Sequence, residues 1–271
     1  MVLEELGYIY STRPKKSLGQ HYLRDRSVLQ RIVDSLELTG NEIVLEIGAG
    51  HGELTSYLAQ RCREVWAVEI DLSNISILRE RLKDFSNVII IHEDILRFQS
   101  NVSFDVIVGN IPYYISGLLL GNLSERWIYK KAVFTLQREV GKRLTAKPGT
   151  KEYGVLTLAV WYNHKVKILF DIPKTCFYPI PKVDSVVVEL ERLEDREIDK
   201  VFFMKIVRAA FSSRRKMLKN VLLDLGLGRE KIIEILERLG ISPTRRGETL
   251  SLEEFLALSR KIYEVIVSSK T

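Results

Sequence analysis

The sequence predicts an α/β protein: a doubly wound, mostly parallel seven-stranded sheet with a small all-helical C-terminal domain. Over the first two-thirds of the chain, short runs rich in β-branched residues alternate with segments of helical length. After the charged stretch 194–197 only segments with helical periodicity follow. The 271 residues are enough for one large core and one small core. We therefore expect two domains, at residues 1–193 and 194–271.

Each expected strand is a short apolar run. The strands are placed at residues 43–47, 65–69, 88–91, 104–108, 131–136, 166–170 and 183–190. The expected helices cover residues 53–60 and 73–83, begin near 138, and continue at 200–211, 214–225, 229–239 and 252–266. Sheets of this kind bind ligands at the carboxyl ends of their strands, so the residues that follow the strands are the candidate site.

Composition narrows the class of protein. Hydrophobic residues make up 46% and charged residues 28% of the chain, as in ordinary globular proteins. No apolar run reaches the roughly 20 residues of a membrane span, and residues 1–16 lack the apolar core of a signal peptide. Cys62 and Cys176 show no metal-binding spacing. We expect a cytoplasmic protein with no metal and no membrane contact, and a monomer.

The net charge of +6 fits a polyanionic partner without proving one. Basic residues gather near the N-terminus, at Arg13, Lys15, Lys16, Arg24, Arg26 and Arg31. They are densest at Arg214, Arg215, Lys216 and Lys219. We interpret this second group as contacts to RNA phosphates. The alternatives are a solvated surface, or ion pairs between the two domains.

A glycine-rich turn follows the first strand, at residues 46–52, and predicts a cofactor site. Glu69 ends the second strand about twenty residues later, where a carboxylate accepts ribose hydroxyls. Asp94 follows the third strand, where a carboxylate reaches an adenine amino group. A dinucleotide site would need glycine at position 53, but Glu53 stands there and would repel a pyrophosphate. A cofactor without phosphate would not be repelled by Glu53.

Asn110-Ile111-Pro112-Tyr113 follows the fourth strand and predicts methyl transfer to an amine. The lone pair of adenine N6 is delocalised, so the amine needs hydrogen-bond acceptors that favour a tetrahedral nitrogen. The side-chain oxygen of Asn110 and the carbonyl of Ile111 are the candidate acceptors. Pro112 restricts Ile111. Tyr113 offers a ring for a base that has left its stack.

Residues 110–113 resemble the signature of the ribosomal RNA adenine dimethyltransferases. Residues 16–23, 177–185 and 211–216 are similar to the branch known as KsgA-type, and residues 245–251 also resemble the family. The resemblance covers nearly the whole chain. It implies a Rossmann-like methyltransferase fold, S-adenosyl-L-methionine as cofactor, and dimethylation of N6 on two adjacent adenines near the 3′ end of small-subunit rRNA. The partner it implies is the rRNA of an assembling 30S-type subunit, which makes the enzyme part of ribosome biogenesis.

The resemblance also assigns roles to residues. It implies that His21 and Leu23 line the cofactor pocket, and that the remaining cofactor-binding residues are Gly48, Glu69, Asp94 and Asn110. It implies that Phe177 stacks on the target adenine opposite Tyr113. Tyr114 departs from the family, in which many members carry Asn or Gln. Three alternatives are an erythromycin-resistance-type enzyme acting on large-subunit rRNA, a non-catalytic RNA-binding factor, and a DNA adenine methyltransferase.

Overall fold

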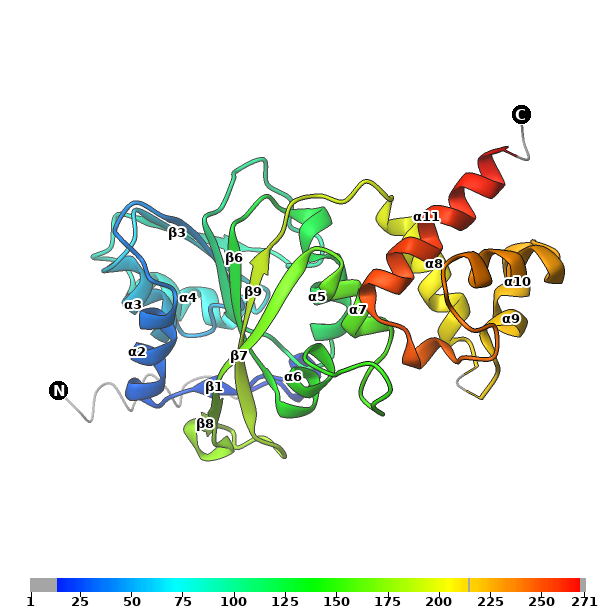
Figure 1. The fold of residues 1–271 in the computed structure, drawn as a ribbon. Coiled ribbons are helices and arrows are strands. Elements are labelled where there is room, and N and C mark those ends of the chain that lie inside the picture. Colours follow the sequence, from blue (N-terminus) through cyan, green and yellow to red (C-terminus); the bar gives the residue numbers. More distant parts are fainter. Residues whose placement is uncertain (1–13, 214, 269–271) are drawn as a thin grey trace. The chain divides into compact units, whose positions relative to one another are not determined.

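A seven-stranded sheet in the order β4-β3-β2-β5-β6-β9-β7 lies at the centre of the N-terminal part of the chain (Figure 1). The computed structural model describes residues 14–213 and 215–268. The strands from β4 to β6 run parallel, and β9 is antiparallel to β6. The predicted fold class is confirmed. The strands are β2 (Ile43–Ile47), β3 (Glu64–Glu69), β4 (Val88–His92), β5 (Val106–Asn110), β6 (Lys131–Gln137), β7 (His164–Ile172) and β9 (Ser185–Arg192).

The order of the strands reverses between β2 and β5. The chain crosses from β2 outward to β3 and β4, and then returns to place β5 on the other side of β2. A ligand crevice is expected where the carboxyl ends of such strands diverge. The two strands approach closely there, because a Cβ on Gly109 would lie 2.4 Å from the backbone oxygen of Ile47. The ends of β2 and β5 therefore mark the place to look for the site.

β5 begins two residues later than the expected strand. The N–H of Asp105 donates to the backbone oxygen of Ile43 (2.9 Å), and the carboxylate of Asp105 accepts from the N–H of Ile43 (3.0 Å), so a side chain takes the place of one backbone acceptor where the two strands meet. The strand then extends to Asn110, which is the last residue of β5 and pairs with Thr135 of β6. The motif at residues 110–113 therefore begins inside the strand, where the sheet fixes the backbone of its first residue.

Helices cover both faces of the sheet. α2 (Arg26–Ser35), α3 (Glu53–Ala59) and α4 (Leu72–Arg81) lie on one side, and α5 (Ser116–Arg126) lies on the other (Figure 1). The sequence analysis did not include α2. Its signal is Asp25, whose carboxylate caps the helix by accepting from the N–H groups of Ser27 and Val28, followed by four buried apolar residues at helical spacing.

A two-stranded sheet holds the start of the described chain against a proline-rich loop. β1 (Tyr22–Leu23) pairs antiparallel with β8 (Phe177–Tyr178), and Leu23 lies opposite Phe177. Neither strand was expected, because two-residue strands carry no periodicity. The 3-10 helix η1 (Lys16–Leu18) precedes β1, and η2 (Lys174–Cys176) precedes β8.

The chain forms two compact units. The sheet unit contains Met1–Gly141 and Lys165–Arg192, and the helical unit contains Lys142–His164 and Leu193–Thr271. The chain passes from the sheet unit to the helical unit for the last time between Arg192 and Leu193, one residue before the boundary expected after residue 193. Segment 142–164 differs from the expectation, because it packs with the C-terminal helices. The hydroxyl of Tyr153 in this segment donates to the backbone oxygen of Leu250 (2.8 Å).

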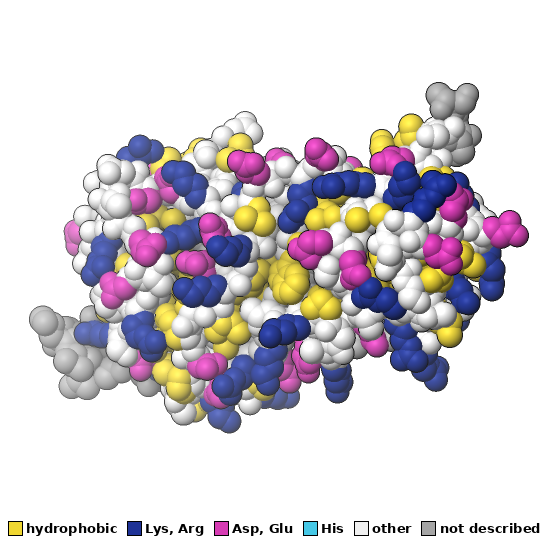
Figure 2. Space-filling model, viewed as in Figure 1, with side chains coloured by type: hydrophobic (Ala, Val, Ile, Leu, Met, Phe, Trp, Pro, Cys, Tyr) yellow, Lys and Arg dark blue, Asp and Glu magenta, His cyan; other side chains and the backbone are white. Residues whose placement is uncertain are grey.

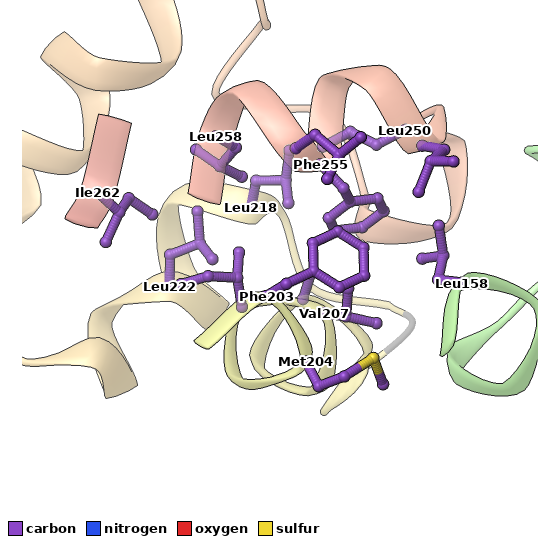
Figure 3. Close-up of a cluster of buried hydrophobic side chains, with 14 of the residues drawn as sticks. Leu158, Phe203, Met204, Val207, Leu218, Leu222, Leu250, Phe255, Leu258 and Ile262 are labelled. Carbon is purple, nitrogen blue, oxygen red and sulfur yellow. The ribbon is translucent and has the colours of Figure 1, made fainter. Parts of the chain in front are cut away.

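A single hydrophobic cluster holds the helical unit together. Leu158 of α7 meets Phe203 of α8 and Phe255 of α11 in this cluster (Figure 3). The helices wholly within this unit are α7 (Val155–Trp161), α8 (Lys200–Phe211), α9 (Leu218–Val221), α10 (Arg229–Arg238) and α11 (Leu252–Ser268), with η3 (Leu222–Leu225) and η4 (Gly247–Thr249); α6 (Arg138–Leu144) spans the boundary. No helix in the described residues is long and apolar enough to cross a membrane.

Within the helix expected over residues 214–225, a regular helix begins only at Leu218 and gives way to a 3-10 helix at Leu222. α8 ends at Phe211, and a regular helix resumes only at Leu218. The N–H groups of Leu218 and Lys219 donate to the backbone oxygens of Arg245 (2.8 Å) and Pro243 (3.3 Å) instead of bonding within a helix. This tertiary pairing overrides the helical periodicity of the segment.

Candidate cofactor and methyl-transfer site

The glycine-rich turn after β2 has the backbone that the sequence predicts. Gly48, Gly50 and Gly52 have φ angles of 73°, 57° and 83°, in the left-handed region that favours glycine. A Cβ on Gly50 would lie 3.2 Å from the ring of Tyr22, so there is little room for a side chain at this position. Gly48, Ala49 and Gly50 of the turn line a pocket together with residues from the ends of β2 and β5.

Glu69 is held against this turn from two sides. One carboxylate oxygen accepts from the N–H of Gly50 (2.7 Å), and the other accepts from the N–H of Asp71 (2.7 Å). The side chain is only 5% exposed. Burial raises the pKa of Glu69, while the two backbone N–H groups oppose that shift. Each oxygen keeps a lone pair, so this fixed carboxyl group suits hydroxyl donors such as those of a ribose.

Asp71 ties the N-terminal segment to the same strand end. Its carboxylate accepts from Lys15 Nζ (2.6 Å), from Gln20 Nε2 (2.8 Å) and from the N–H of Ser73 (3.0 Å). Burial alone would raise the pKa of Asp71, but these hydrogen bonds outweigh it and lower the pKa to about 2. The sequence analysis missed Asp71. Its signal is a carboxylate two residues after a strand-end acid and at the N-cap of α4.

Asn110 lines the pocket at the end of β5. Its Nδ2 donates to the backbone oxygen of His21 (2.7 Å), an arrangement that leaves the side-chain oxygen as the acceptor. His21 in turn donates from Nδ1 to the backbone oxygen of Pro179 (2.6 Å), since a carbonyl oxygen only accepts. Its ring stacks on Tyr113 with ring centres 5.7 Å apart. His21 therefore joins the N-terminal segment, the catalytic motif and the proline-rich loop.

Most of the expected site residues line one pocket. They are His21, Leu23, Gly48, Glu69, Asn110, Ile111, Pro112 and Tyr113. The lining also includes Tyr114, Glu46 at the start of the expected glycine-rich turn, and two residues that the sequence analysis did not assign to the cofactor, Gln20 and Asn74. Among the described lining residues there are three glutamates and no lysine or arginine. The pocket therefore suits a ligand with positive rather than negative charge.

Asp94 and Phe177 lie elsewhere. The carboxylate of Asp94 accepts from the N–H of Leu96 (2.9 Å), and it is not part of the pocket lining. Burial, and after it the charge of Asp94, raise the pKa of Tyr114, which does line the pocket. Phe177 is only 3% exposed and packs in a hydrophobic cluster with Leu23 and Val187. In this structure it is a core residue, so its stacking on a base stays a prediction.

The basic residues expected to contact RNA belong to the helical unit. Arg215 and Lys216 are exposed and Lys219 is half-buried, while Arg214 lies outside the described residues. Arg215, Lys216 and Lys219 make no ion pair within the described part of that unit. Arg246 is also exposed, and follows Arg245, whose backbone oxygen accepts from Leu218 N–H (2.8 Å). Figure 2 shows that lysine and arginine are interspersed with acidic side chains on the visible face.

Comparison with known proteins shows the family of the chain. The family model described as ribosomal RNA adenine dimethylase matches residues 11–263. The chain belongs to this family. It is 39% identical, over 98% of its own length and all of the other chain, to the ribosomal RNA small subunit methyltransferase A of Clostridium botulinum. It is 41% identical to the protein of that name from Bacillus mycoides, covering 96% of this chain and 94% of the other.

Two solved structures of the family's fold are similar over most of the chain. A dimethyladenosine transferase from Plasmodium falciparum superposes with a TM-score of 0.80 at 27% identity, covering 89% of this chain and 97% of that one. The 23S rRNA methyltransferase ErmE superposes with a TM-score of 0.70, also at 27% identity, covering 89% and 98%.

Proposed function

We propose that this protein transfers methyl groups from S-adenosyl-L-methionine to N6 of two adjacent adenines near the 3′ end of small-subunit rRNA, giving N6,N6-dimethyladenine. Relatives that are 39–41% identical carry the name ribosomal RNA small subunit methyltransferase A. The proposed partner is the rRNA of an assembling small subunit in the cytoplasm, which the protein meets as a monomer.

The pocket residues fit this cofactor. Glu69 would accept the ribose hydroxyls, and the turn at Gly48 and Gly50 gives close backbone approach. Asp94 is the proposed partner of the adenine amino group. The acidic lining matches a cofactor with a net positive charge and no phosphate. When bound, S-adenosyl-L-methionine supplies a methyl group on a sulfonium, which is already an activated electrophile.

The orientation of Asn110 is the observation that carries the proposed chemistry. Because Nδ2 is committed to the backbone oxygen of His21, Oδ1 is the atom available to accept from the N6 amino group. The carbonyl of Ile111 is the proposed second acceptor, and Pro112 restricts the conformation of that residue. Two fixed acceptors favour a tetrahedral nitrogen, whose lone pair is free to attack. Tyr113 contributes a half-buried side chain to the lining of the pocket.

The helical unit would hold the RNA. Arg215, Lys216 and Lys219, together with Arg214, are the proposed phosphate contacts, and exposed Arg246 lies next to the segment that anchors them. Such contacts position a nucleic acid without reading its sequence.

The deciding experiment is methyl transfer from labelled S-adenosyl-L-methionine to unmethylated small subunits, with large-subunit rRNA in a parallel reaction. We expect dimethyladenine confined to the 3′ end of the small-subunit rRNA. Label in large-subunit rRNA would instead support the activity of the 23S rRNA methyltransferase ErmE, which shares the fold. A protein that bound the cofactor but labelled neither RNA would contradict the proposed substrate.

A further inference from the structure

Tyr114 is an exposed aromatic residue that belongs to the lining of the pocket. It is 60% exposed, more than any other tyrosine among the described residues, and it follows directly on the motif at residues 110–113. A single exposed apolar side chain on a protein surface needs no explanation. One that continues the wall of a ligand pocket is different, because it is placed to meet the part of a ligand that projects from the pocket.

The ring of Tyr114 is held in place on the side of the N-terminal segment. A Cβ on Gly19 would lie 3.6 Å from Cδ1 of Tyr114 and 4.0 Å from Cβ of Pro112, so the backbone of Gly19 faces both side chains at close range. The backbone before and after Tyr114 is also fixed, because the N–H of Ile115 donates to the backbone oxygen of Pro112 (3.2 Å). A ring that is already positioned loses little further freedom when a partner stacks on it.

The charges around the ring favour a neutral partner over an anion. Burial raises the pKa of Tyr114, and the charges of Asp94 and Glu69 add to that shift, so the hydroxyl keeps its proton at neutral pH. The same two acidic side chains would repel a phosphate group placed beside the ring. A nucleobase has no net charge and presents a flat π face, so it suits this ring better than the backbone of an RNA does.

The position of Tyr114 in the chain selects one base in particular. Tyr113 is the residue proposed to meet the target adenine, so the next residue is placed for a nucleotide next to the target. A base that leaves its stack uncovers the face of its neighbour, and an aromatic side chain replaces the stacking that is lost. We propose that Tyr114 stacks on the nucleotide next to the target, so that one adenine of the proposed pair rests on Tyr114 while the other occupies the pocket. This inference rests on the proposed function, because it requires an RNA with two adjacent target adenines.

Substitutions at Tyr114 separate its ring from its hydroxyl. Tyr114→Asn should lower kcat/KM for unmethylated small subunits at least about fivefold, because one stack between a base and an aromatic ring is lost. Tyr114→Phe keeps the ring and should recover most of that loss. Leu118→Asn is the matched control, since Leu118 is a comparably exposed apolar residue (57%) in the first turn of α5 that is not part of the pocket lining. The affinity for S-adenosyl-L-methionine, measured by calorimetry, should be the same in all three variants.

Removing the neighbouring base gives the sharpest test. Small subunits are reconstituted with rRNA in which each of the two adenines is replaced in turn by an abasic residue, which leaves a single target. Because the ring lies on one side of the pocket, only one of the two replacements takes away its partner. On that substrate the wild type and Tyr114→Asn should have equal kcat/KM, whereas they should differ at least about fivefold when both adenines are present. The comparison isolates the contact from any effect of the variant on folding or on the cofactor.

The outcomes separate this inference from the proposed function. A loss in Tyr114→Asn that persists on both abasic substrates would overturn the stacking role, and so would wild-type kcat/KM in Tyr114→Asn on the intact pair. An equal loss in Tyr114→Phe would assign the effect to the hydroxyl and would overturn it as well. In each of these cases the wild type still methylates the small subunit, so the enzyme assignment is untouched. Failure of the wild type to methylate subunits that carry both adenines would overturn the proposed function itself.

Discussion

The pocket at the end of β5 and the basic segment 215–219 place their functional groups in opposite ways. In the pocket, Asn110 and Glu69 are fixed by hydrogen bonds to backbone atoms, and the strand order sets their positions. In the basic segment, Arg215 and Lys216 project into solvent from a stretch that is neither helix nor strand. Chemistry needs fixed acceptors, whereas phosphate contact needs only charge within reach.

The difference predicts how each region responds to substitution. Removing one fixed group from the pocket should damage a single step severely. Removing charges from the basic segment should weaken binding gradually and by an amount that depends on salt, because exposed charges act over distance and are screened. The variants that follow test this contrast, beginning with the largest effect.

Asn110→Ala should reduce the turnover number by about a hundredfold to a thousandfold, as expected when one preorganised transition-state hydrogen bond is removed. The measurement is single-turnover methyl transfer to small subunits, with RNA binding measured alongside. Asn122→Ala is the matched control, because that amide donates to the backbone oxygen of Leu118 (3.0 Å) on an exposed part of α5. Near-normal turnover in Asn110→Ala would rule out its proposed role.

Arg215→Ala combined with Lys216→Ala should weaken RNA binding about tenfold and reduce the slope of log affinity against log salt by about 1.5, if each residue neutralises one phosphate. Cofactor affinity should not change. Lys231→Ala with Arg238→Ala is the control, since both cations already pair with Glu234 on α10 (2.8 and 2.7 Å). An unchanged salt slope would place the phosphate contacts elsewhere and favour the ion-pair alternative.

Long periodic segments made the fold predictable. The strands at residues 43–47 and 88–91 are nearly as expected, because runs of buried β-branched residues leave few other structures open. β1 and β8 were not predictable, because two-residue strands exist only through their pairing across more than 150 residues of chain. The helix expected from residue 214 failed for a similar reason, since the backbone of Arg245 competes for its hydrogen bonds.

The site was predictable where sequence position fixes geometry. Glu69 and Asn110 end parallel strands, so their side chains meet at one edge of the sheet. Glu46 belongs to the expected turn, but its burial within the sheet is visible only in three dimensions. For Phe177 the family resemblance implies stacking on the target adenine, and its burial in the core of this structure leaves that role a prediction.

Asp71→Asn should weaken S-adenosyl-L-methionine binding by roughly tenfold, because the N-terminal segment loses part of its tie and one amide N–H₂ group would face a donor. The pKa of Asp71 is about 2 in the folded protein and 3.8 ordinarily, so its contribution to stability is present above about pH 4 and is lost as the pH falls towards 2. The difference in Tm between wild type and variant should shrink over that range. Asp34→Asn, which loosens an exposed pair with Arg61, should show neither effect. A constant difference in Tm down to pH 2 would contradict this account.

Phe177→Leu should have the smallest effect. It tests whether Phe177 is only a core residue or also contacts the target adenine. If Phe177 is a core residue, the swap keeps an apolar side chain but removes part of its volume, and should cost about 1–2 kcal/mol in the free energy of unfolding. The value of kcat/KM for the small subunit should then stay within about threefold of wild type. If Phe177 instead stacked on the target base, losing that stack would cost about 1–3 kcal/mol and lower kcat/KM further. Phe170→Leu, a ring packed against the same cluster but not expected near the target, gives the matched stability control. A tenfold loss of kcat/KM in Phe177→Leu alone, with equal stability in the two variants, would mean that the ring leaves the core to meet the adenine, and the loop at 177–182 would then be a moving part of the site.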